Sequence, residues 1–179
     1  MHERRFNAEI ARLRSPERVA LLEVDRVIDE CLRGINVRSV LDVGTGSGIF
    51  AEAFAKRGIS VTGIDPNPEM LKAAKKFVAR GKFRHGIIEE IPFKGKSFDL
   101  VFLGHVLHES DDVAKALAET KRCATQRVVV LEWPFKEEEI GPPLEHRLDS
   151  ADIEAIARRV GFQHVKTIEL MHMILFIFS

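Results

Sequence analysis

The chain has 179 residues, 45% of them hydrophobic, which is enough for one globular domain with a sizeable core. Its 27 Lys and Arg residues balance 27 Asp and Glu residues, which weighs against broad electrostatic binding to nucleic acid or anionic lipid. The first ten residues lack the apolar run of a signal peptide and no apolar stretch is long enough to span a membrane, so we expect a cytoplasmic protein.

Helix signals recur along the chain from Ser15 onward. Ser15 followed by Pro16 is typical of a helix start and Gly34 of a helix end, so one helix is expected from Pro16 to Arg33. Further helices are expected where apolar residues recur at helical spacing, in the ranges 49–57, 68–80, 113–120 and 153–160.

Apolar and β-branched runs between these helices predict seven strands. They occupy residues 37–42, 59–65, 82–88, 97–103, 127–132, 165–170 and 172–178. The run 127–132 is the most strongly β-branched, as expected of a strand that is buried on both faces. The last two strands follow each other too closely for a crossover helix, so they should form an antiparallel hairpin.

This alternation predicts an α/β fold. We expect a single doubly wound, Rossmann-like sheet of seven mostly parallel strands, with an antiparallel C-terminal hairpin and helices on both faces. Residues 1–179 should form one domain, with residues 1–34 as an N-terminal helical lid region and residues 35–179 as the core. The loop from Trp133 to Leu148 is expected to act as a second lid. Ligands of such sheets bind at the carboxyl ends of the strands.

The turn after the first strand carries the clearest chemical signal. Its glycines, Gly44, Gly46 and Gly48, are spaced G-x-G-x-G, whereas a dinucleotide fingerprint requires G-x-G-x-x-G and would place its third glycine at Ile49. Asp42 stands two residues before the first glycine. A carboxylate at this point repels phosphate and suits a cation, so the turn favours a positively charged ligand over NAD or FAD. The alternative is that the glycines only make a tight strand–helix connection.

A second carboxylate, Asp65, ends the next strand. At the tip of a neighbouring strand it can accept hydrogen bonds from both hydroxyls of a ribose, and no arginine flanks it to hold a 2′-phosphate. Asp65 as a simple turn residue before Pro66 is the alternative. A ribose site, adjacent glycine backbone and a pocket that tolerates a cation together describe S-adenosylmethionine.

At this point the chain resembles the class I S-adenosylmethionine-dependent methyltransferases, in particular the small-molecule branch that includes ubiquinone/menaquinone-biosynthesis-like enzymes. The resemblance spans roughly residues 37–170. It rests on segments that are similar to the family's first motif, its second motif, its adenine-binding segment and its fourth-strand motif: 40–48, 63–71, 86–93 and 98–108.

The resemblance implies a cofactor site, with S-adenosylhomocysteine as the product left in it. Asp42 would lie near the amino group, Asp65 would bind the ribose, and Pro66 and Met70 would contact adenine. The family often has Asp where this chain has Ile87, so the backbone of Ile88 and the nearby Glu89 would serve the adenine instead. The implied cofactor-binding residues are Asp42, Gly44, Thr45, Gly46, Gly48, Asp65, Pro66, Met70, Ile87, Ile88, Glu89, Gly104 and His105.

Two histidines follow the fourth strand, where the family places its methyl-transfer pocket. Methyl transfer from a sulfonium is an in-line displacement that mainly needs positioning, and a histidine base helps when the nucleophile is a hydroxyl or an acidic carbon. We expect His105 to line the junction of cofactor and acceptor and His108 to be a candidate base. Both can equally be structural histidines. A metal pair completed by Glu109 or His146 lacks convincing spacing, so no metal site is expected.

These observations predict methyl transfer from S-adenosylmethionine to a small organic or lipid-like acceptor. The stretch Leu103–Val106 lacks the Asn/Asp-Pro-Pro-aromatic motif of amino-group methyltransferases, and the balanced charge makes a nucleic-acid partner unexpected. Trp133 could cap the acceptor pocket or pack in the core. The alternatives are a non-catalytic module that binds the cofactor or its product, an RNA- or protein-directed methyltransferase, and a nucleotide-dependent oxidoreductase.

Overall fold

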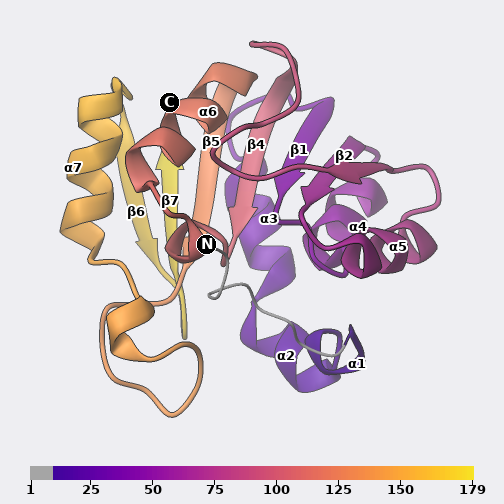
Figure 1. Ribbon diagram of the computed structural model, residues 1–179, viewed down its shortest axis with the longest axis horizontal. Helices are drawn as coiled ribbons and strands as arrows, with labels where there is room; N and C mark the ends of the chain where they lie inside the picture. The colour runs from indigo at the N-terminus through magenta and orange to yellow at the C-terminus, as the bar shows by residue number, and fades with distance from the viewer. Residues whose placement is uncertain (1–9) are drawn as a thin grey trace.

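The computed structural model describes residues 10–179. The first nine residues of the expected lid, on which the expectation of no signal peptide also rests, lie outside the described residues. Seven strands form one sheet in the order β3-β2-β1-β4-β5-β7-β6 (Figure 1). β7 runs antiparallel to both neighbours and the other pairings are parallel, which confirms the predicted fold class and hairpin. The strands are β1 (Ser39–Val43), β2 (Ser60–Asp65), β3 (Lys82–His85), β4 (Phe98–Gly104), β5 (Ala124–Glu132), β6 (Val165–Glu169) and β7 (Ile174–Phe178).

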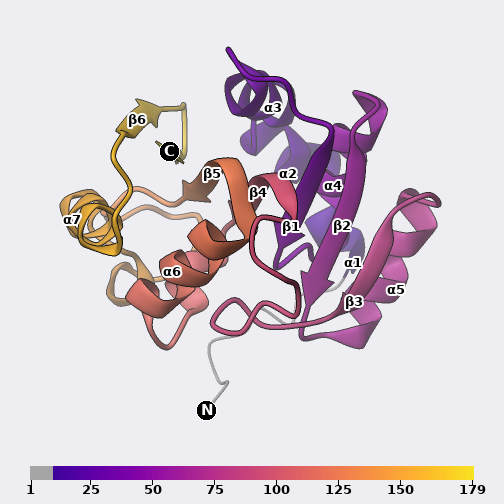
Figure 2. The ribbon, with the colours of Figure 1, turned by 90° about the horizontal axis from the view of Figure 1, so that it is seen from above.

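Helices cover both faces of the sheet, which is seen from above in Figure 2. The α-helices are α1 (Ile10–Leu13), α2 (Pro16–Leu21), α3 (Val24–Leu32), α4 (Ile49–Lys56), α5 (Pro68–Phe77), α6 (Val113–Cys123) and α7 (Ser150–Val160). Two short 3₁₀ turns, η1 (Leu107–Glu109) and η2 (Leu144–His146), lie in loops. Within residues 10–179, no helix is both long and apolar enough to cross a membrane.

Two apolar cores sandwich the sheet because successive strand residues face opposite sides. Val40 packs with α3 and α4, whereas its neighbour Leu41 packs with α6 and α7. In β4, Leu100 and Val101 divide between the two cores in the same way, and all four side chains are fully buried. The central strands are therefore rigid, and their carboxyl ends present the loops that follow at fixed positions.

Local signals set most helix ends where the sequence predicts them. Asn67 caps α5 by accepting a hydrogen bond from the backbone N–H of Glu69 (3.0 Å), with Pro68 at the first helical position. Asp112 caps α6 by accepting from the N–H of Lys115 (2.9 Å). Gly161 ends α7 in the left-handed conformation, with φ of 99°.

The prediction of a single helix from Pro16 to Arg33 is wrong. The chain forms two helices, α2 and α3, separated at Glu23, which adopts a left-handed φ of 44°. The carboxylate of Glu23 accepts hydrogen bonds from the side chain of Arg26 (2.9 Å) and from the backbone N–H of Met171 (2.7 Å). The apolar periodicity continues through this point, so the break is set by a contact with the β6–β7 connection that lies far away in sequence.

Several other element ends differ from expectation, and two of them lie beside the carboxyl end of β2 or the helix that follows it. Helix α5 stops at Phe77 rather than near Gly81, and Val78 leaves the helix to become buried against the sheet. Strand β3 stops at His85 rather than Ile88. A Cβ on Gly86 would lie 3.0 Å from Pro92 Cδ, so the chain turns tightly here and places residues 86–89 in a loop beside the carboxyl end of β2.

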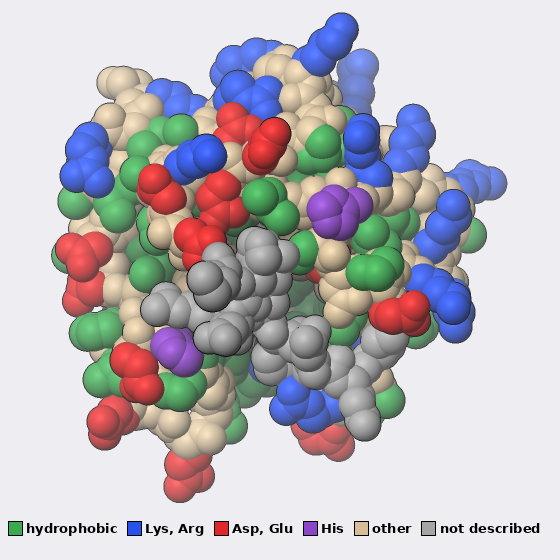
Figure 3. Space-filling view, viewed as in Figure 1, with side chains coloured by type: hydrophobic (Ala, Val, Ile, Leu, Met, Phe, Trp, Pro, Cys, Tyr) green, Lys and Arg blue, Asp and Glu red, His purple; other side chains and the backbone are tan. Residues whose placement is uncertain are grey.

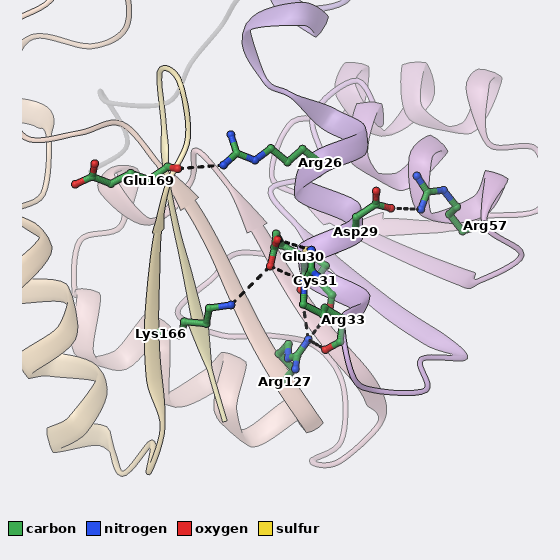
Figure 4. A network of polar contacts seen from close by, with 9 residues as sticks. All are labelled: Arg26, Asp29, Glu30, Cys31, Arg33, Arg57, Arg127, Lys166 and Glu169. Carbon is green, nitrogen blue, oxygen red and sulfur yellow. Dashed lines mark hydrogen bonds and ion pairs between the residues drawn. The ribbon is translucent and has the colours of Figure 1, made fainter.

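The C-terminus of α3 is anchored to the sheet by a polar network (Figure 4). The guanidinium of Arg127, on β5, donates to the backbone carbonyls of Glu30, Cys31 and Arg33 at 2.8–3.4 Å. These carbonyls have no partner within the helix, so Arg127 supplies the missing hydrogen bonds. Lys166 on β6 adds an ion pair with Glu30 at 3.7 Å. The network fixes α3 against the sheet while α2 extends away from it.

The balanced charge of the chain is unevenly distributed over its surface. Figure 3 shows Lys and Arg side chains gathered over the side of the molecule that carries α5. The exposed basic residues of α5 and β3 and of the turn between them are Lys72, Lys75, Lys76, Arg80, Lys82 and Arg84. The expectation that the protein has no nucleic-acid partner therefore stays a prediction.

Candidate active site

A cavity of about 980 Å³ lies at the carboxyl ends of β1, β2 and β4, where ligands of doubly wound sheets bind. Its walls come from the turn after β1, the loops after β2, β3 and β4, residues of the N-terminal helices, Trp133 and the segment 141–146. The predicted site residues that line it are Asp42, Gly44, Thr45, Gly46, Asp65, Pro66, Met70, Ile87, Ile88, Glu89, Gly104, His105 and His108.

The glycine turn is held open by backbone geometry. Gly44 and Gly46 have φ of 66° and 52°, which side chains with a Cβ rarely adopt. A Cβ on Gly44 would also lie 2.6 Å from a methyl group of Val106, so that turn and the loop after β4 approach as closely as glycine allows. The backbone N–H of Thr45 donates to the carbonyl of Ile64 (2.9 Å), which ties the turn to β2.

Gly48 does not line the cavity. It is the left-handed N-cap of α4, with φ of 81°, and a Cβ there would lie 3.0 Å from both Cα and Cβ of Ala74. Its glycine identity therefore permits α4 and α5 to pack closely. Its predicted contact with a cofactor stays a prediction, whereas its structural role follows directly from this geometry.

Asp42 is a buried carboxylate at the inner end of the cavity. Its side chain is held by the hydroxyl of Thr45, which donates to Oδ2 at 2.6 Å. Burial raises the pKa of Asp42 to about 7; the Thr45 hydrogen bond opposes the rise and the nearby charge of Asp65 adds to it. A carboxylate in this state is stabilised in its ionised form by a cation, so this end of the cavity suits a positively charged group.

Asp65 joins the end of β2 to the glycine turn. Its Oδ2 accepts a hydrogen bond from the backbone N–H of Gly46 (2.9 Å), and its Oδ1 accepts from the N–H of Asn67 (2.8 Å). The carboxylate is thereby fixed in orientation. The carboxylate also borders the cavity, where it is suited to accept hydrogen bonds from donors such as ribose hydroxyls.

The loop after β3 forms an apolar wall opposite α5. Met70 and Ile88 are buried side chains that border the cavity, and Ile87 lines it beside them. Glu89 accepts a hydrogen bond from the backbone N–H of Asp111 (2.8 Å), so its carboxylate connects this loop to the one after β4. The sequence predicts that adenine binds against this wall, and that assignment stays a prediction.

His105, in the loop after β4, lines the cavity. Its backbone has a positive φ of 58°, unusual for a side chain with a Cβ, and its N–H donates to the carbonyl of Leu131 (2.9 Å). Its ring stacks on Trp133 with centroids 5.2 Å apart, and Nε2 lies 3.1 Å from Met173 Sδ. Burial lowers the pKa of His105 to about 3, so the ring is neutral near pH 7.

His108 and Glu132 form a buried pair. Nδ1 of His108 lies 2.8 Å from Oε2 of Glu132, and the backbone N–H of His108 donates to the other oxygen of that carboxylate (3.2 Å). Burial disfavours the charged ring, but the carboxylate outweighs it and raises the pKa of His108. Burial also opposes ionisation of Glu132, yet His108 outweighs it and lowers the pKa of Glu132.

The sequence analysis missed Glu132. The signal for it was available: Glu132 is an acid at the carboxyl end of the most β-branched strand, and this end lies at the same sheet edge as His108. The sequence left Trp133 as either a pocket cap or a core residue, and it is both: the residue is 4% exposed within an apolar core, and it borders the cavity.

Comparison with known proteins bears on this geometry. The profile of a family described as "Methyltransferase domain" matches residues 41–131, just over half of the chain. The chain belongs to this methyltransferase family. The matched region contains the glycine turn, Asp42, Asp65 and the two histidines that follow β4, so the resemblance found in the sequence is confirmed.

Curated relatives match the methyltransferase domain over part of their length. A demethylmenaquinone methyltransferase of Chlorobaculum tepidum is 38% identical over 92 residues, which are 51% of this chain and 38% of that protein. A malonyl-[acyl-carrier protein] O-methyltransferase of Serratia marcescens is 34% identical over 92 residues, again 51% of this chain and 36% of that protein. The matched region thus spans less than two fifths of either relative.

A solved structure matches nearly the whole chain. A SAM dependent methyltransferase from Aquifex aeolicus superposes with a TM-score of 0.84 at 25% identity, covering 94% of this chain and 95% of that one. The similarity therefore extends beyond the region that the family profile matches, to the N-terminal helices and the C-terminal hairpin.

The segment after β5 contributes Trp133, Gly141–Pro143 and His146 to the lining of the cavity. It is organised by Arg147, whose buried guanidinium donates to the backbone carbonyls of Pro134, Lys136, Ile140 and Pro142 at 2.7–3.0 Å. The same guanidinium lies 5.6 Å from the ring centroid of Trp133. One side chain thus holds a loop of irregular backbone against the ring that borders the cavity.

Proposed function

We propose that this protein is an S-adenosylmethionine-dependent methyltransferase that transfers a methyl group in-line to a small organic or lipid-like acceptor. The single observation that carries the proposal is the pair of carboxylates, Asp42 and Asp65, on either side of an open glycine turn in one cavity. The family to which the chain belongs and the names of its relatives support the same activity.

The residues present fit this cofactor chemically. Asp42 suits the positive charge of the amino acid part, Asp65 suits ribose hydroxyls, and the apolar wall at Met70 and Ile88 suits adenine. When bound, S-adenosylmethionine supplies a methyl group on a sulfonium that leaves with the bonding electron pair. The protein's own contribution is to position the acceptor on the line of the breaking bond and to exclude water.

We further propose that the N-terminal helices and the loop 133–148 act as lids. Leu13 and Arg18 reach the cavity from the N-terminal helices, and residues Gly141–Pro143 and His146 reach it from the loop. The cavity extends past the carboxylates to these lids, which leaves room for an acceptor and favours an enzyme over a module that only binds the cofactor. The cytoplasmic location expected from the sequence stays a prediction.

The two histidines are suited to different tasks. His105, neutral near pH 7, is a poor base and serves as a polar surface at the junction between cofactor and acceptor. His108 borders the cavity with Glu132 behind it, and a carboxylate in this position stabilises the imidazolium that forms when the ring accepts a proton. His108 is therefore the candidate base for an acceptor hydroxyl or acidic carbon, and Glu132 its positioning residue.

Glu132→Gln should lower the pKa of His108, because the variant removes the charge that raises it while keeping an oxygen near Nδ1. An NMR pH titration of the His108 ring, assigned with His108→Gln, measures the shift. The matched control is Glu137→Gln on the exposed part of the second lid. An unchanged His108 titration in Glu132→Gln would contradict the pair.

The same pair makes a pH-dependent contribution to stability. The raised pKa of His108 adds stability that is present below its unfolded value of 6.5 and is lost as pH rises through the folded value. The lowered pKa of Glu132 adds stability that is present above 4.5 and is lost as pH falls through its folded value. Glu132→Gln should therefore destabilise most between these pH values, as denaturant unfolding would show.

Calorimetry with S-adenosylhomocysteine and with NADH tests the function. We expect saturable binding of S-adenosylhomocysteine and none of NADH, since the Asp42 side of the turn repels a diphosphate. Binding of NADH but not of S-adenosylhomocysteine would overturn the methyltransferase proposal and support an oxidoreductase. Transfer of a labelled methyl group to any member of a small-molecule acceptor library then separates an enzyme from a binding module, which would bind the product without turnover.

A further inference from the structure

Arg18 is a cationic side chain in the cavity with no anionic partner among residues 10–179. It lies on α2, is half-buried, and borders the cavity on the lid side. Its guanidinium lies 5.5 Å from the ring centroid of Trp133, with no ion pair and no side-chain hydrogen bond to a described residue. Other enclosed guanidiniums differ: Arg127 and Arg147 donate to three or more backbone carbonyls each.

The electrostatic surroundings of Arg18 are unfavourable to its charge. Burial lowers the pKa of Arg18, and the nearby positive charge of Arg12, which also borders the cavity, lowers it further. The charge of Arg18 in turn reaches His105 and contributes to the lowered pKa of that ring. Five carboxylates line the same cavity, yet none of them forms an ion pair with Arg18: Asp42, Asp65, Glu89, Glu109 and Asp111.

A partly desolvated guanidinium that makes no ion pair or side-chain hydrogen bond with residues 10–179 is costly, and an oxyanion in the cavity would remove that cost. The planar fork of arginine binds carboxylate and phosphate through two parallel hydrogen bonds, which a lysine cannot match. The position is also suitable for an acceptor: it lies on the lid side, beside the Trp133 ring that stacks on His105 at the junction with the cofactor half.

We propose that Arg18 binds an anionic group of the acceptor, a carboxylate or a phosphate. The acceptor is then a small anion whose apolar part lies toward Trp133 and His105, and α2 closes over it as the lid. This proposal rests on the proposed function, because the bound anion is a methyl acceptor only if the protein is a methyltransferase. The anion site itself depends on Arg18 and can be tested without turnover.

The intrinsic fluorescence of Trp133, which lies beside Arg18, can report binding at this site. Trp133 is the only tryptophan and the sequence has no tyrosine, so intrinsic fluorescence reports the surroundings of one ring. The experiment titrates the protein with benzoate, with phenyl phosphate and with benzamide, which keeps the shape of benzoate without its charge. Each titration is run with and without S-adenosylhomocysteine, and the affinity for S-adenosylhomocysteine is measured separately by calorimetry.

In the wild type we expect a saturable change with benzoate or phenyl phosphate, and binding of benzamide weaker by about tenfold or more, the scale of a charge-assisted hydrogen bond. The stronger of the two anions identifies the acceptor group as carboxylate or phosphate. Arg18→Gln should abolish the preference for the anion, and Arg18→Lys should keep part of it. Arg80→Gln, which removes an exposed arginine beyond the end of α5, should retain it in full.

Equal binding of benzamide and benzoate, no saturable response to either anion, or a preference that survives in Arg18→Gln would overturn the proposal. If Arg18→Gln does not fold, the affinity of Arg18→Lys for the anion is compared with that of the wild type. A site that uses the guanidinium fork loses affinity on this change, whereas a site that needs only a positive charge keeps it. A wild type that does not bind S-adenosylhomocysteine but still prefers benzoate would refute the methyltransferase proposal and leave the anion site standing.

Discussion

Replacing Asp65 by alanine should weaken S-adenosylhomocysteine binding by about 1–3 kcal/mol, or roughly 5- to 150-fold in Kd, as expected when charge-assisted hydrogen bonds are lost. The carboxylate does two things in the structure: it fixes the glycine turn through Gly46 and Asn67, and it faces the cavity. Calorimetry measures the loss. Asp25→Ala, at a side chain that is 94% exposed on α3, is the matched control.

A second ligand separates the two roles of Asp65. The 2′-deoxy analogue of S-adenosylhomocysteine lacks one of the hydroxyls that the carboxylate is proposed to bind. If Asp65 binds the ribose directly, removal of this hydroxyl should weaken binding to the wild type and have little effect on binding to Asp65→Ala. Equal losses in both proteins would mean that Asp65 acts only by holding the turn, and the ribose assignment would be wrong.

The half of the cavity that we propose binds the cofactor was predictable because its signals are local. Gly44 and Gly46 occupy positive-φ positions directly after a buried strand, and Asp42 and Asp65 end neighbouring strands. Once the strands were known to be parallel, both carboxylates had to meet at one edge of the sheet. Gly48 shows the limit of this reasoning. It belongs to the same motif but packs against α5 instead of lining the cavity, and the spacing of the glycines does not distinguish these two roles.

The half that we propose binds the acceptor was less predictable because its contacts join residues that are distant in sequence. His108 meets Glu132 across two strand ends, and Arg18 meets Trp133 through the position of α2. That position depends on the helix break at Glu23, which is held by the backbone N–H of Met171. The apolar pattern of residues 16–33 fits one continuous helix equally well, so the sequence contains no local sign that α2 turns toward the cavity.

Arg147→Met should release the loop that follows β5 and expose the acceptor side of the cavity. Arg147 satisfies four backbone carbonyls and approaches Glu138 at 3.5 Å while almost fully buried. The loop's own backbone hydrogen bonds are short-range turns, such as that from the N–H of Lys136 to the carbonyl of Pro134, so the Arg147 side chain joins parts of the loop that these turns do not. Each of these carbonyls that stays buried without a donor costs about 1–3 kcal/mol. Because the loop lies at the surface, we expect much of this cost to appear as local opening rather than global unfolding.

Hydrogen exchange and fluorescence distinguish these outcomes. Amide exchange in residues 134–147 should accelerate by tenfold or more, since each ~1.4 kcal/mol of lost local stability corresponds to a factor of about ten. Emission of Trp133 should shift to the red as water reaches the ring, while exchange in β1 and β4 should change far less. Arg159→Met on the exposed side of α7 is the matched control.

Arg147→Lys decides whether charge or geometry organises the loop. A lysine keeps the positive charge and the apolar stem but cannot donate to four carbonyls in fixed directions. If the fork of donors is what matters, Arg147→Lys should resemble Arg147→Met in exchange rates and in Trp133 emission. A lysine variant that behaves like the wild type would show that charge next to Glu138 suffices, and the loop would then be held by electrostatics rather than by its carbonyl bonds.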